Sequence, residues 1–265
     1  PPVADLELQP ATGLSDEELA TLFTSSYEGY LVPFAVDASA MRFLTETFDL
    51  DRAASVVAVR GGERVGLANL GLRGAEAWVG GVGVVPAERR RGTGRRLMHA
   101  LHENARSRGV ERIWLEVIVG NTSAIALYEQ LGYARVRDLE VWSLPGTASE
   151  ANVNEVDAEE AHAWIREHSV EREPWQRDDA SLAKATDLGG LVVDGAAAVV
   201  RPGGGRVSVV QIAGDEEPLR ELLRGVRSLG AVSVLNLPAG HPASLALAAL
   251  GGTADVRQHE MLLRL

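Results

Sequence analysis

The pattern of apolar and polar positions at the start of the chain predicts helices first and strands afterwards. Residues 15–30 carry apolar side chains at helical spacing, and Ser15 is followed three residues later by a glutamate, as in a capping box. A second helix is predicted over residues 37–48. Residues 53–60 and 64–73 are β-rich runs around a Gly-Gly turn, which predicts a hairpin.

The rest of the first half predicts one more strand and then helices that alternate with strands. Residues 74–86 form a third β-rich run that ends at a proline, and the glycines within it indicate a bulge or a close backbone approach. Helical spacing over residues 94–109 and 121–132 predicts two helices, each followed by a strand, at 110–120 and 133–144. This order predicts the α/β class, with a mixed, mostly antiparallel sheet flanked by helices.

An internal repeat relates the two halves of the chain. Residues 124–140 align without a gap on residues 244–260, and the element order upstream of the second copy matches as well. That upstream stretch predicts three strands, a helix and a strand, at residues 188–214, 215–230 and 231–238. We therefore expect two tandem domains, of residues 1–145 and 146–265, joined by a linker over residues 145–152.

Composition narrows the classes of protein. The 265 residues are 46% hydrophobic and 24% charged and include no cysteine, which excludes disulfides, thiolate chemistry and cysteine-ligated metals. The formal net charge of −11 argues against general nucleic-acid binding. No apolar run is long enough to span a bilayer, and the first ten residues lack signal-peptide features. We expect a cytoplasmic protein with neither nucleic-acid nor membrane partners.

One basic segment stands out in this acidic chain. Residues 84–101 run from a strand end into a helix start and hold five arginines around two glycines. Such a helix start offers unpaired backbone N–H groups and a positive dipole end to an anion. The segment lacks the lysine of a P-loop and the third glycine of a dinucleotide fingerprint. It therefore predicts a site for a small polyanion.

Two motifs carry a resemblance to a known family. Arg89-x-x-Gly92-x-Gly94 resembles the pyrophosphate loop of the GNAT superfamily of acyl-CoA N-acyltransferases, whose motif is Gln/Arg-x-x-Gly-x-Gly/Ala. Residues 121–133 resemble the family's second motif, Asn-x-x-Ala-x-x-Leu-Tyr-x-x-x-Gly-Phe/Tyr. The resemblance covers residues 5–144. It implies an N-acetyltransferase (EC 2.3.1.-) that uses acetyl-CoA as cosubstrate, without a metal.

The resemblance also implies which residues hold acetyl-CoA. Backbone groups of Val82 and Val84 would bond the pantetheine amides, and Asn121 would contact the cofactor near the pantetheine arm. Arg89 and Arg91 are candidates for the outer phosphates. The pyrophosphate would be wrapped by the backbone N–H groups of Arg90, Arg91, Gly92, Thr93, Gly94 and Arg95. Arg96 is as well explained as a solvated helix residue.

For catalysis, the resemblance implies that Tyr128 protonates the departing CoA thiolate, while its alternative is plain core packing. The attacking amine must be neutral, so a base is needed. Glu116 is the first choice, because it precedes Tyr128 by twelve residues, as does the base proposed in the ribosomal-protein alanine acetyltransferases, which these motifs also resemble. A structural strand carboxylate is its alternative, and Glu76 is the second choice as base. A backbone N–H near Val84 or Val85 would meet the oxyanion.

Two groups of residues remain open at this stage. Tyr27, Tyr30 and Phe34 lie between the first two predicted helices, in the region that lines the acceptor pocket in the family, and are either pocket or core. His99 and His102 stand three residues apart on one helix, which could begin a metal site. With no third ligand evident, a solvated helix face is the favoured interpretation.

The second copy lacks the residues that carry this chemistry. At the repeat spacing Tyr128, Glu116 and Asn121 correspond to Ala248, Asn236 and His241, and the arginine loop is replaced by the acids of residues 215–217. Acids at a helix start repel phosphate, so this half resembles a degenerate GNAT domain without a CoA loop, as in the tandem arrangement of mycothiol synthases.

The identity of the acceptor stays open. The expected partner is a small-molecule amine or a peptide amine, and a homodimer is possible. The alternatives to a small-amine acetyltransferase are a protein N-terminal acetyltransferase and an acyl-CoA-binding sensor or interaction module without turnover.

Overall fold

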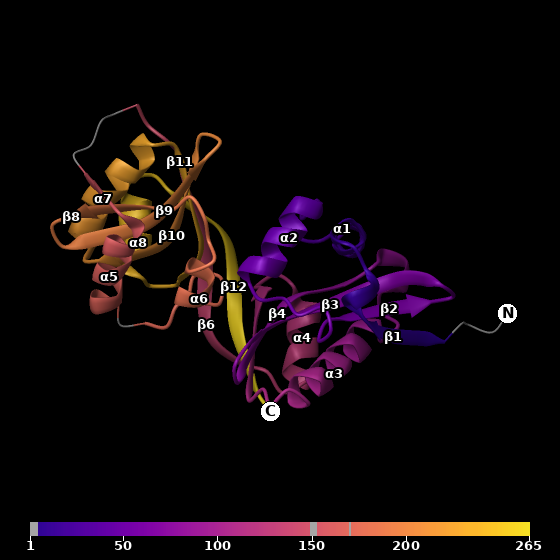
Figure 1. Cartoon of the computed structure of the whole chain (residues 1–265). Coiled ribbons are helices and arrows are strands. Elements are labelled where there is room, and N and C mark those ends of the chain that lie inside the picture. Colours follow the sequence, from indigo (N-terminus) through magenta and orange to yellow (C-terminus); the bar gives the residue numbers. More distant parts are fainter. Residues whose placement is uncertain (1–4, 149–152, 170) are drawn as a thin grey trace. The chain divides into compact units, whose positions relative to one another are not determined.

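The computed structural model describes residues 5–148, 153–169 and 171–265 (Figure 1). It divides into two compact units, one of Pro1–Val136 with Glu260–Leu265 and one of Arg137–His259. The chain therefore passes from the first unit into the second after residue 136 and returns after residue 259. Residues 149–152 of the predicted linker lie outside the described residues.

The first unit is built on a sheet with the strand order β1-β2-β3-β4-β5-β12. Neighbours from β1 to β4 pair antiparallel, whereas β4 and β5 pair parallel, which confirms the predicted mixed sheet. The strands are β1 (Leu6–Pro10), β2 (Val56–Arg60), β3 (Glu63–Arg73), β4 (Glu76–Val84), β5 (Arg112–Ile118) and the end of β12 (Thr253–Arg264). Met261 and Leu263 of β12 belong to the core of this unit.

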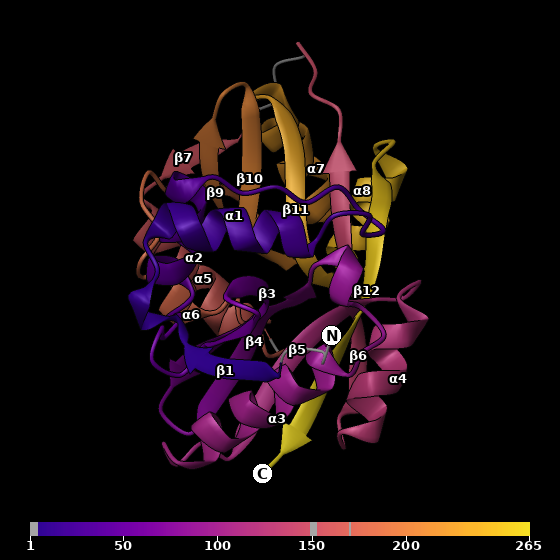
Figure 2. The same cartoon turned by 90° about the vertical axis from the view of Figure 1, so that its right-hand side faces the viewer.

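Two helices cover each face of this sheet. They are α1 (Asp16–Ser26), α2 (Ala38–Thr47), α3 (Thr93–Arg106) and α4 (Thr122–Gln130). In Figure 1 and in the turned view of Figure 2, α1 and α2 lie on one face and α3 and α4 on the other. The predicted capping box is present, since Ser15 N donates to Glu18 Oε2 at 2.8 Å and Glu18 N to Ser15 Oγ at 3.2 Å.

A bulge and a splay open the middle of the first sheet. The register of β3 against β4 shifts between Asn69 and Leu70, so Gly80 is an extra residue and confirms the predicted bulge. The parallel pairing of β4 with β5 covers only Glu76–Trp78 against Arg112–Trp114, although both strands continue. The two strands therefore part after Trp78 and leave an opening between them.

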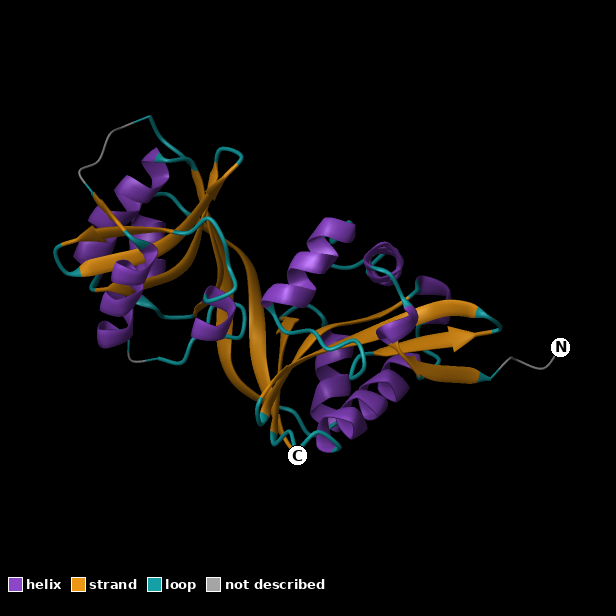
Figure 3. Cartoon of the chain, in the orientation of Figure 1, coloured by secondary structure: helices purple, strands orange, loops and turns teal. Residues whose placement is uncertain are grey.

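The second unit repeats this plan with the strand order β12-β6-β11-β10-β9-β8-β7, helices covering both faces of its sheet (Figure 3). As in the first unit, a parallel pair, β10 with β11, lies beside a bulged antiparallel pair, β10 with β9. The strands are β6 (Ala134–Leu144), β7 (Asn154–Val156), β8 (Gly189–Val193), β9 (Ala196–Gly203), β10 (Arg206–Gly214) and β11 (Ala231–Pro238). The helices are α5 (Ala158–His168), α6 (Asp179–Leu182), α7 (Glu216–Ser228) and α8 (Pro242–Ala249).

One sequence expectation on α3 is wrong. His102 is not on a solvated face, because it is only 3% exposed and its Nε2 lies 2.9 Å from the hydroxyl oxygen of Tyr133. Burial, with a smaller effect of the neighbouring Arg106, lowers the pKa of His102 to about 4, so the imidazole is neutral. His99 is exposed as expected. Within the described ranges no group of three or more acidic, histidine or cysteine side chains is arranged to hold a metal.

Candidate active site

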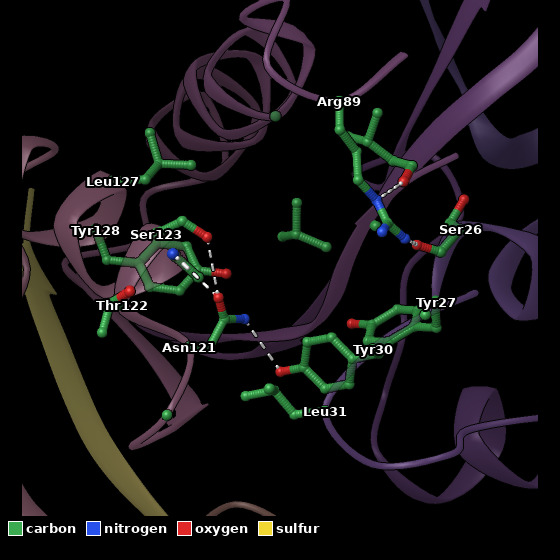
Figure 4. Close-up of a pocket in the computed structure, with 17 residues that line it drawn as sticks. Ser26, Tyr27, Tyr30, Leu31, Arg89, Asn121, Thr122, Ser123, Leu127 and Tyr128 are labelled. Carbon is green, nitrogen blue, oxygen red and sulfur yellow. Dashed lines mark hydrogen bonds between the residues drawn. The ribbon is translucent and has the colours of Figure 1, made fainter. Parts of the chain in front are cut away.

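A cavity of about 420 Å³ lies in the first unit at the opening between β4 and β5 (Figure 4). Its walls come from the end of α1 and the following loop, from β4, and from the first turns of α3 and α4. A smaller cavity of about 70 Å³ has Tyr27, Tyr30, Asn121 and Tyr128 among the lining residues that it shares with the larger one, and it reaches Glu116. Together the two cavities lead from the start of α3 to Glu116.

The start of α3 has a backbone suited to an anion. Gly92 is the N-cap with φ 81°, and no described side chain caps the helix. Arg90, two residues earlier, is also left-handed at φ 65°, a conformation that non-glycine residues seldom adopt. When left-handed residues lie this close together in the sequence, neighbouring backbone N–H groups can point into one concave site. The helix dipole adds positive potential at the same place. This geometry fits a pyrophosphate.

Arg89 is directed at the protein backbone in this structure. Its guanidinium donates to the carbonyl oxygens of Val84 at 2.9 Å and Ser26 at 3.1 Å (Figure 4). It also donates to the carbonyl oxygen of Glu28 at 2.6 Å. Sequence reasoning proposed this side chain for an outer phosphate. The structure places it at the cavity wall, where it joins the strand end to the last turn of α1 and the loop that follows.

The other arginines of the loop lie on the surface. Arg91 is paired with Glu88 at 2.9 Å, whereas Arg90 is exposed and has no hydrogen-bond or ion-pair partner among the described residues. Two more are tied to the first unit by polar contacts: Arg95 to Gln130 and Arg96 to the Leu6 carbonyl at 2.8 Å. Arg90 and Arg91 are therefore the side chains best placed to meet a charge outside the loop.

The backbone of β4 presents alternate groups to the opening. Val85 N donates to the Val65 carbonyl of β3 at 3.0 Å. Because successive N–H groups of an extended strand point to opposite sides, the N–H groups of Val84 and Val82 point away from β3, toward the side from which β5 has parted. Of the two residues named for the oxyanion, Val84 has the N–H that faces the opening, and that of Val85 is engaged with β3.

Asn121 is fixed at the mouth of the smaller cavity. Its Oδ1 accepts from Ala124 N at 3.2 Å, which caps α4, and from the Ser123 hydroxyl at 3.2 Å. Its Nδ2 lies 3.4 Å from the hydroxyl of Tyr30, in the loop after α1. This amide therefore links the start of α4 to the loop that forms the opposite wall (Figure 4).

Tyr128 extends from α4 into both cavities and is 8% exposed. Burial, and to a lesser extent Tyr30 nearby, raises the pKa of the Tyr128 phenol far above its usual value. The hydroxyl is therefore protonated throughout the physiological range and can donate a proton. Tyr128 also belongs to the hydrophobic core between α3, α4 and the sheet, as the core-packing interpretation expects, and its role as proton donor stays a prediction.

The two carboxylates that were proposed as the base, Glu116 and Glu76, differ in whether they reach the cavities. Glu116 lines the smaller cavity together with Tyr128, and its Oε2 accepts a hydrogen bond from the Trp78 indole at 2.8 Å. Glu76 lines neither of these cavities in the described part of the chain. It is paired with Arg112 at 2.7 Å and accepts from the Trp114 indole at 2.8 Å.

The sequence analysis did not predict that Trp78 and Trp114 donate hydrogen bonds to the two candidate glutamates. The signal was present, because Glu76-x-Trp78 and Trp114-x-Glu116 are mirrored patterns on two strands that are parallel neighbours. In parallel strands such residues stand on the same face and can contact one another across the pair.

The second unit has helix starts in the corresponding places, but its described part lacks the arginine and the glutamate that line the site of the first unit. His241 caps α8 as Asn121 caps α4, and Asn236, the counterpart of Glu116, is buried and accepts from Gln258 at 2.7 Å. A cavity of about 460 Å³ lies at the starts of α7 and α8. Glu171 and Asp215 line it, and no arginine or lysine is among its described lining residues.

Comparison with known proteins agrees with this geometry. Residues 17–133 match the model of the acetyltransferase (GNAT) family. Over 58 residues the chain is 47% identical to a ribosomal protein bS18-alanine N-acetyltransferase of Salmonella typhimurium, covering 22% of this chain and 39% of that protein. Over 92 residues it is 39% identical to a mycothiol acetyltransferase of Thermobispora bispora, covering 32% and 31%. Each match spans less than half of the relative.

The fold is shared over a much longer stretch. A solved tandem GNAT protein from the clavulanic acid biosynthesis pathway superposes with a TM-score of 0.62 over 98% of both chains, at 17% identity. At this identity the likeness concerns the fold, and it extends over both copies of the repeat.

Among the described residues, no helix has both the length and the apolar character needed to span a bilayer.

Proposed function

We propose that this chain, whose residues 17–133 belong to the acetyltransferase (GNAT) family, moves the acetyl group of acetyl-CoA to a primary amine by direct attack. The observation that carries the proposal is the pair of cavities that share lining residues and lead from the start of α3 to Tyr128 and Glu116. An anion-binding helix start, a protonated phenol and a carboxylate are the three groups that this reaction requires.

The first unit offers a binding group for each part of acetyl-CoA. The N–H groups of residues 90–95 suit the pyrophosphate, and the exposed side chains of Arg90 and Arg91 suit the outer phosphates. The backbone of Val82 and Val84 suits the amides of the pantetheine arm, with Asn121 nearby. When bound, acetyl-CoA supplies a thioester carbonyl that is open to attack.

The side chains of the smaller cavity move the protons. Glu116 takes a proton from the amine nitrogen as the N–C bond forms. As the C–S bond breaks, Tyr128 gives its hydroxyl proton to the thiolate sulfur. The phenolate then regains a proton from solvent and Glu116 releases one, so the net reaction moves one proton from amine to thiol.

The acceptor must reach Glu116 through a narrow space. The smaller cavity holds about 70 Å³, which favours an amine on a slender arm over one on a bulky, branched carbon. A small-molecule amine and a peptide N-terminus can both meet this condition. The relatives named above include one of each kind by name, an N-acetyltransferase for an alanine of a ribosomal protein and a mycothiol acetyltransferase.

The test is the release of CoA from acetyl-CoA with a panel of slender and branched amines. We expect turnover with at least one slender amine, and a loss of about 10²–10³ in kcat for Tyr128→Phe at unchanged affinity for acetyl-CoA. Tyr133→Phe is the matched control, because Tyr133 is buried on the same segment and lines neither cavity. Binding of acetyl-CoA without turnover for any amine would favour a sensor.

A further inference from the structure

A side-chain hydrogen bond joins β4 and β5 at the point where they part. The last backbone pair between these strands is Trp78 with Trp114, and Glu116 is the second residue beyond it on β5. The Trp78 indole Nε1 donates across the strands to Glu116 Oε2 at 2.8 Å. This bond therefore spans the vertex of the opening that forms the smaller cavity.

The indole of Trp78 is itself held in place. It is 7% exposed and packs edge-on against Phe48, with ring centroids 5.7 Å apart. A Cβ at Gly80 would lie 2.9 Å from the indole ring, so the ring occupies the space that the glycine leaves free. The donor of the hydrogen bond is therefore a rigid group fixed by packing.

A fixed donor has two effects on a carboxylate. A glutamate side chain has three rotatable bonds, and a charge-assisted hydrogen bond to one oxygen selects one orientation among its rotamers. The same bond favours the ionised carboxylate over the protonated form. For a proton acceptor both effects act in one direction, since the group must be aimed at the cavity and ionised at the working pH.

We propose that Trp78 is a positioning residue for Glu116, which it orients toward the cavity and keeps in the proton-accepting form through the indole N–H. This inference rests on the proposed role of Glu116 as base. Among the described residues, the other titratable groups that line the smaller cavity are Tyr27 and Tyr30 from the loop after α1 and Tyr128 from α4.

The chain contains a matched control in the mirrored pair. Trp114 donates to Glu76 Oε2 at the same distance of 2.8 Å, on the same two strands and with the same exposed fraction of 7%. Glu76 is also paired with Arg112, and it stands on the side of the vertex where the strands are still paired. Removing the indole N–H of Trp114 therefore perturbs the same sheet while the hydrogen bond from Trp78 to Glu116 stays in place.

The experiment compares Trp78→Phe with Trp114→Phe in the full chain, using the pH profile of kcat with the best amine of the panel. For Trp78→Phe we expect kcat to fall about tenfold and KM for acetyl-CoA to stay unchanged. The acid limb of the profile, where kcat falls because the base becomes protonated, should move up by about one pH unit. For Trp114→Phe we expect kcat within about twofold of wild type and an unmoved limb. An unmoved limb and unchanged kcat in Trp78→Phe would overturn the proposal.

Glu116→Gln separates this inference from the proposed function. If Glu116→Gln keeps wild-type kcat and the acid limb, Glu116 is not the base and the proposed mechanism fails. If Glu116→Gln loses both while Trp78→Phe behaves as wild type, only the positioning role is refuted.

A second measurement does not depend on turnover. The carboxyl carbon of Glu116, labelled with ¹³C and assigned through Glu116→Gln, is titrated by NMR in wild type and in both tryptophan variants. We expect the midpoint to rise by about one pH unit in Trp78→Phe alone. Equal midpoints in wild type and Trp78→Phe would refute the inference. If Trp78→Phe loses the wild-type circular dichroism spectrum, 3-benzothienylalanine at position 78, which keeps the ring shape without the N–H, is measured instead.

Discussion

The guanidinium of Arg89 donates a hydrogen bond to the backbone carbonyl of Glu28 at 2.6 Å and thereby ties the end of β4 to the loop after α1. The same side chain also holds the carbonyls of Ser26 and Val84. A residue that the sequence suggested as a phosphate ligand thus shapes the cavity, because it fixes the segment that carries Tyr27 and Tyr30.

This relationship predicts a double effect of Arg89→Ala. We expect the free energy of unfolding to fall by about 2 kcal/mol, because three carbonyls lose a charged donor, and KM for acetyl-CoA to rise about tenfold. Thermal unfolding and steady-state kinetics measure the two. Arg90→Ala is the control, since Arg90 is exposed, and it should leave stability unchanged. Unaltered stability in Arg89→Ala would contradict the role given to these hydrogen bonds.

A bulky side chain in the first turn of α3 should block the larger cavity. A Cβ at Gly94 would lie 3.8 Å from Leu127 and 3.9 Å from Val84, which is ordinary contact, so the backbone tolerates a side chain whose outer atoms fill the cavity. For Gly94→Leu we expect at least a hundredfold loss of affinity for CoA with the fold intact. Calorimetry measures the affinity and circular dichroism the fold.

The control for this variant is Gly203→Leu, at a position in the second unit where a Cβ meets no described atom within 4 Å. It should bind CoA as wild type does. Retained affinity in Gly94→Leu would refute the assignment of the larger cavity to CoA.

The number of CoA sites per chain is a further prediction. The second unit begins α7 with Glu216 and Glu217, and its cavity is lined by Asp215 and Glu171, so an anionic ligand meets negative charge there. Isothermal titration calorimetry of the full chain should give one CoA site, and Gly94→Leu should abolish it. A stoichiometry of two would show that the second copy still binds the cofactor.

Acid should weaken the fold partly through His102. Its pKa is about 4 in the folded protein, below the ordinary 6.5, so between these values the unfolded chain binds a proton that the folded chain does not. The free energy of unfolding therefore falls as the pH drops from about 6.5 to about 4, by up to about 3 kcal/mol for this group. His241, whose pKa burial also lowers to about 4, acts in the same direction.

Urea unfolding of wild type, His102→Gln and His99→Gln across this pH range tests the effect. Glutamine does not titrate and can keep a hydrogen bond to Tyr133, so His102→Gln should show a weaker pH dependence. His99 is exposed, and its replacement should leave the wild-type dependence. Identical slopes for wild type and His102→Gln would contradict the prediction.

Much of the fold could be predicted from local patterns. The capping box at Ser15, the Gly-Gly hairpin and the amphipathic α3 depend on residues that are neighbours in sequence, and each is present. The elements that were not predicted are the helices α5 and α6 of the second unit and the two strands β1, which spans five residues and ends in a proline, and β7, which spans three. Such strands are defined by their partners in the sheet more than by their own side chains.

His102 shows a prediction that failed although its signal was available. It stands four residues after Met98 and three before Ala105, both of which are buried. This spacing puts it on the apolar face of α3. It was assigned to a solvated face because no third metal ligand was evident, whereas its position in the helical period and its partner Tyr133 decide its burial.

The sequence by itself determined most of the elements, the repeat, the arginine- and glycine-rich loop and the absence of that loop from the second copy, because each depends on residues close together in the chain. Only the tertiary structure decided that Glu116 and not Glu76 reaches the cavity of Tyr128, that Arg89 binds backbone carbonyls, and that the end of β12 completes the first core. These outcomes depend on which strands become neighbours and where they part, and that is fixed by packing between segments distant in sequence.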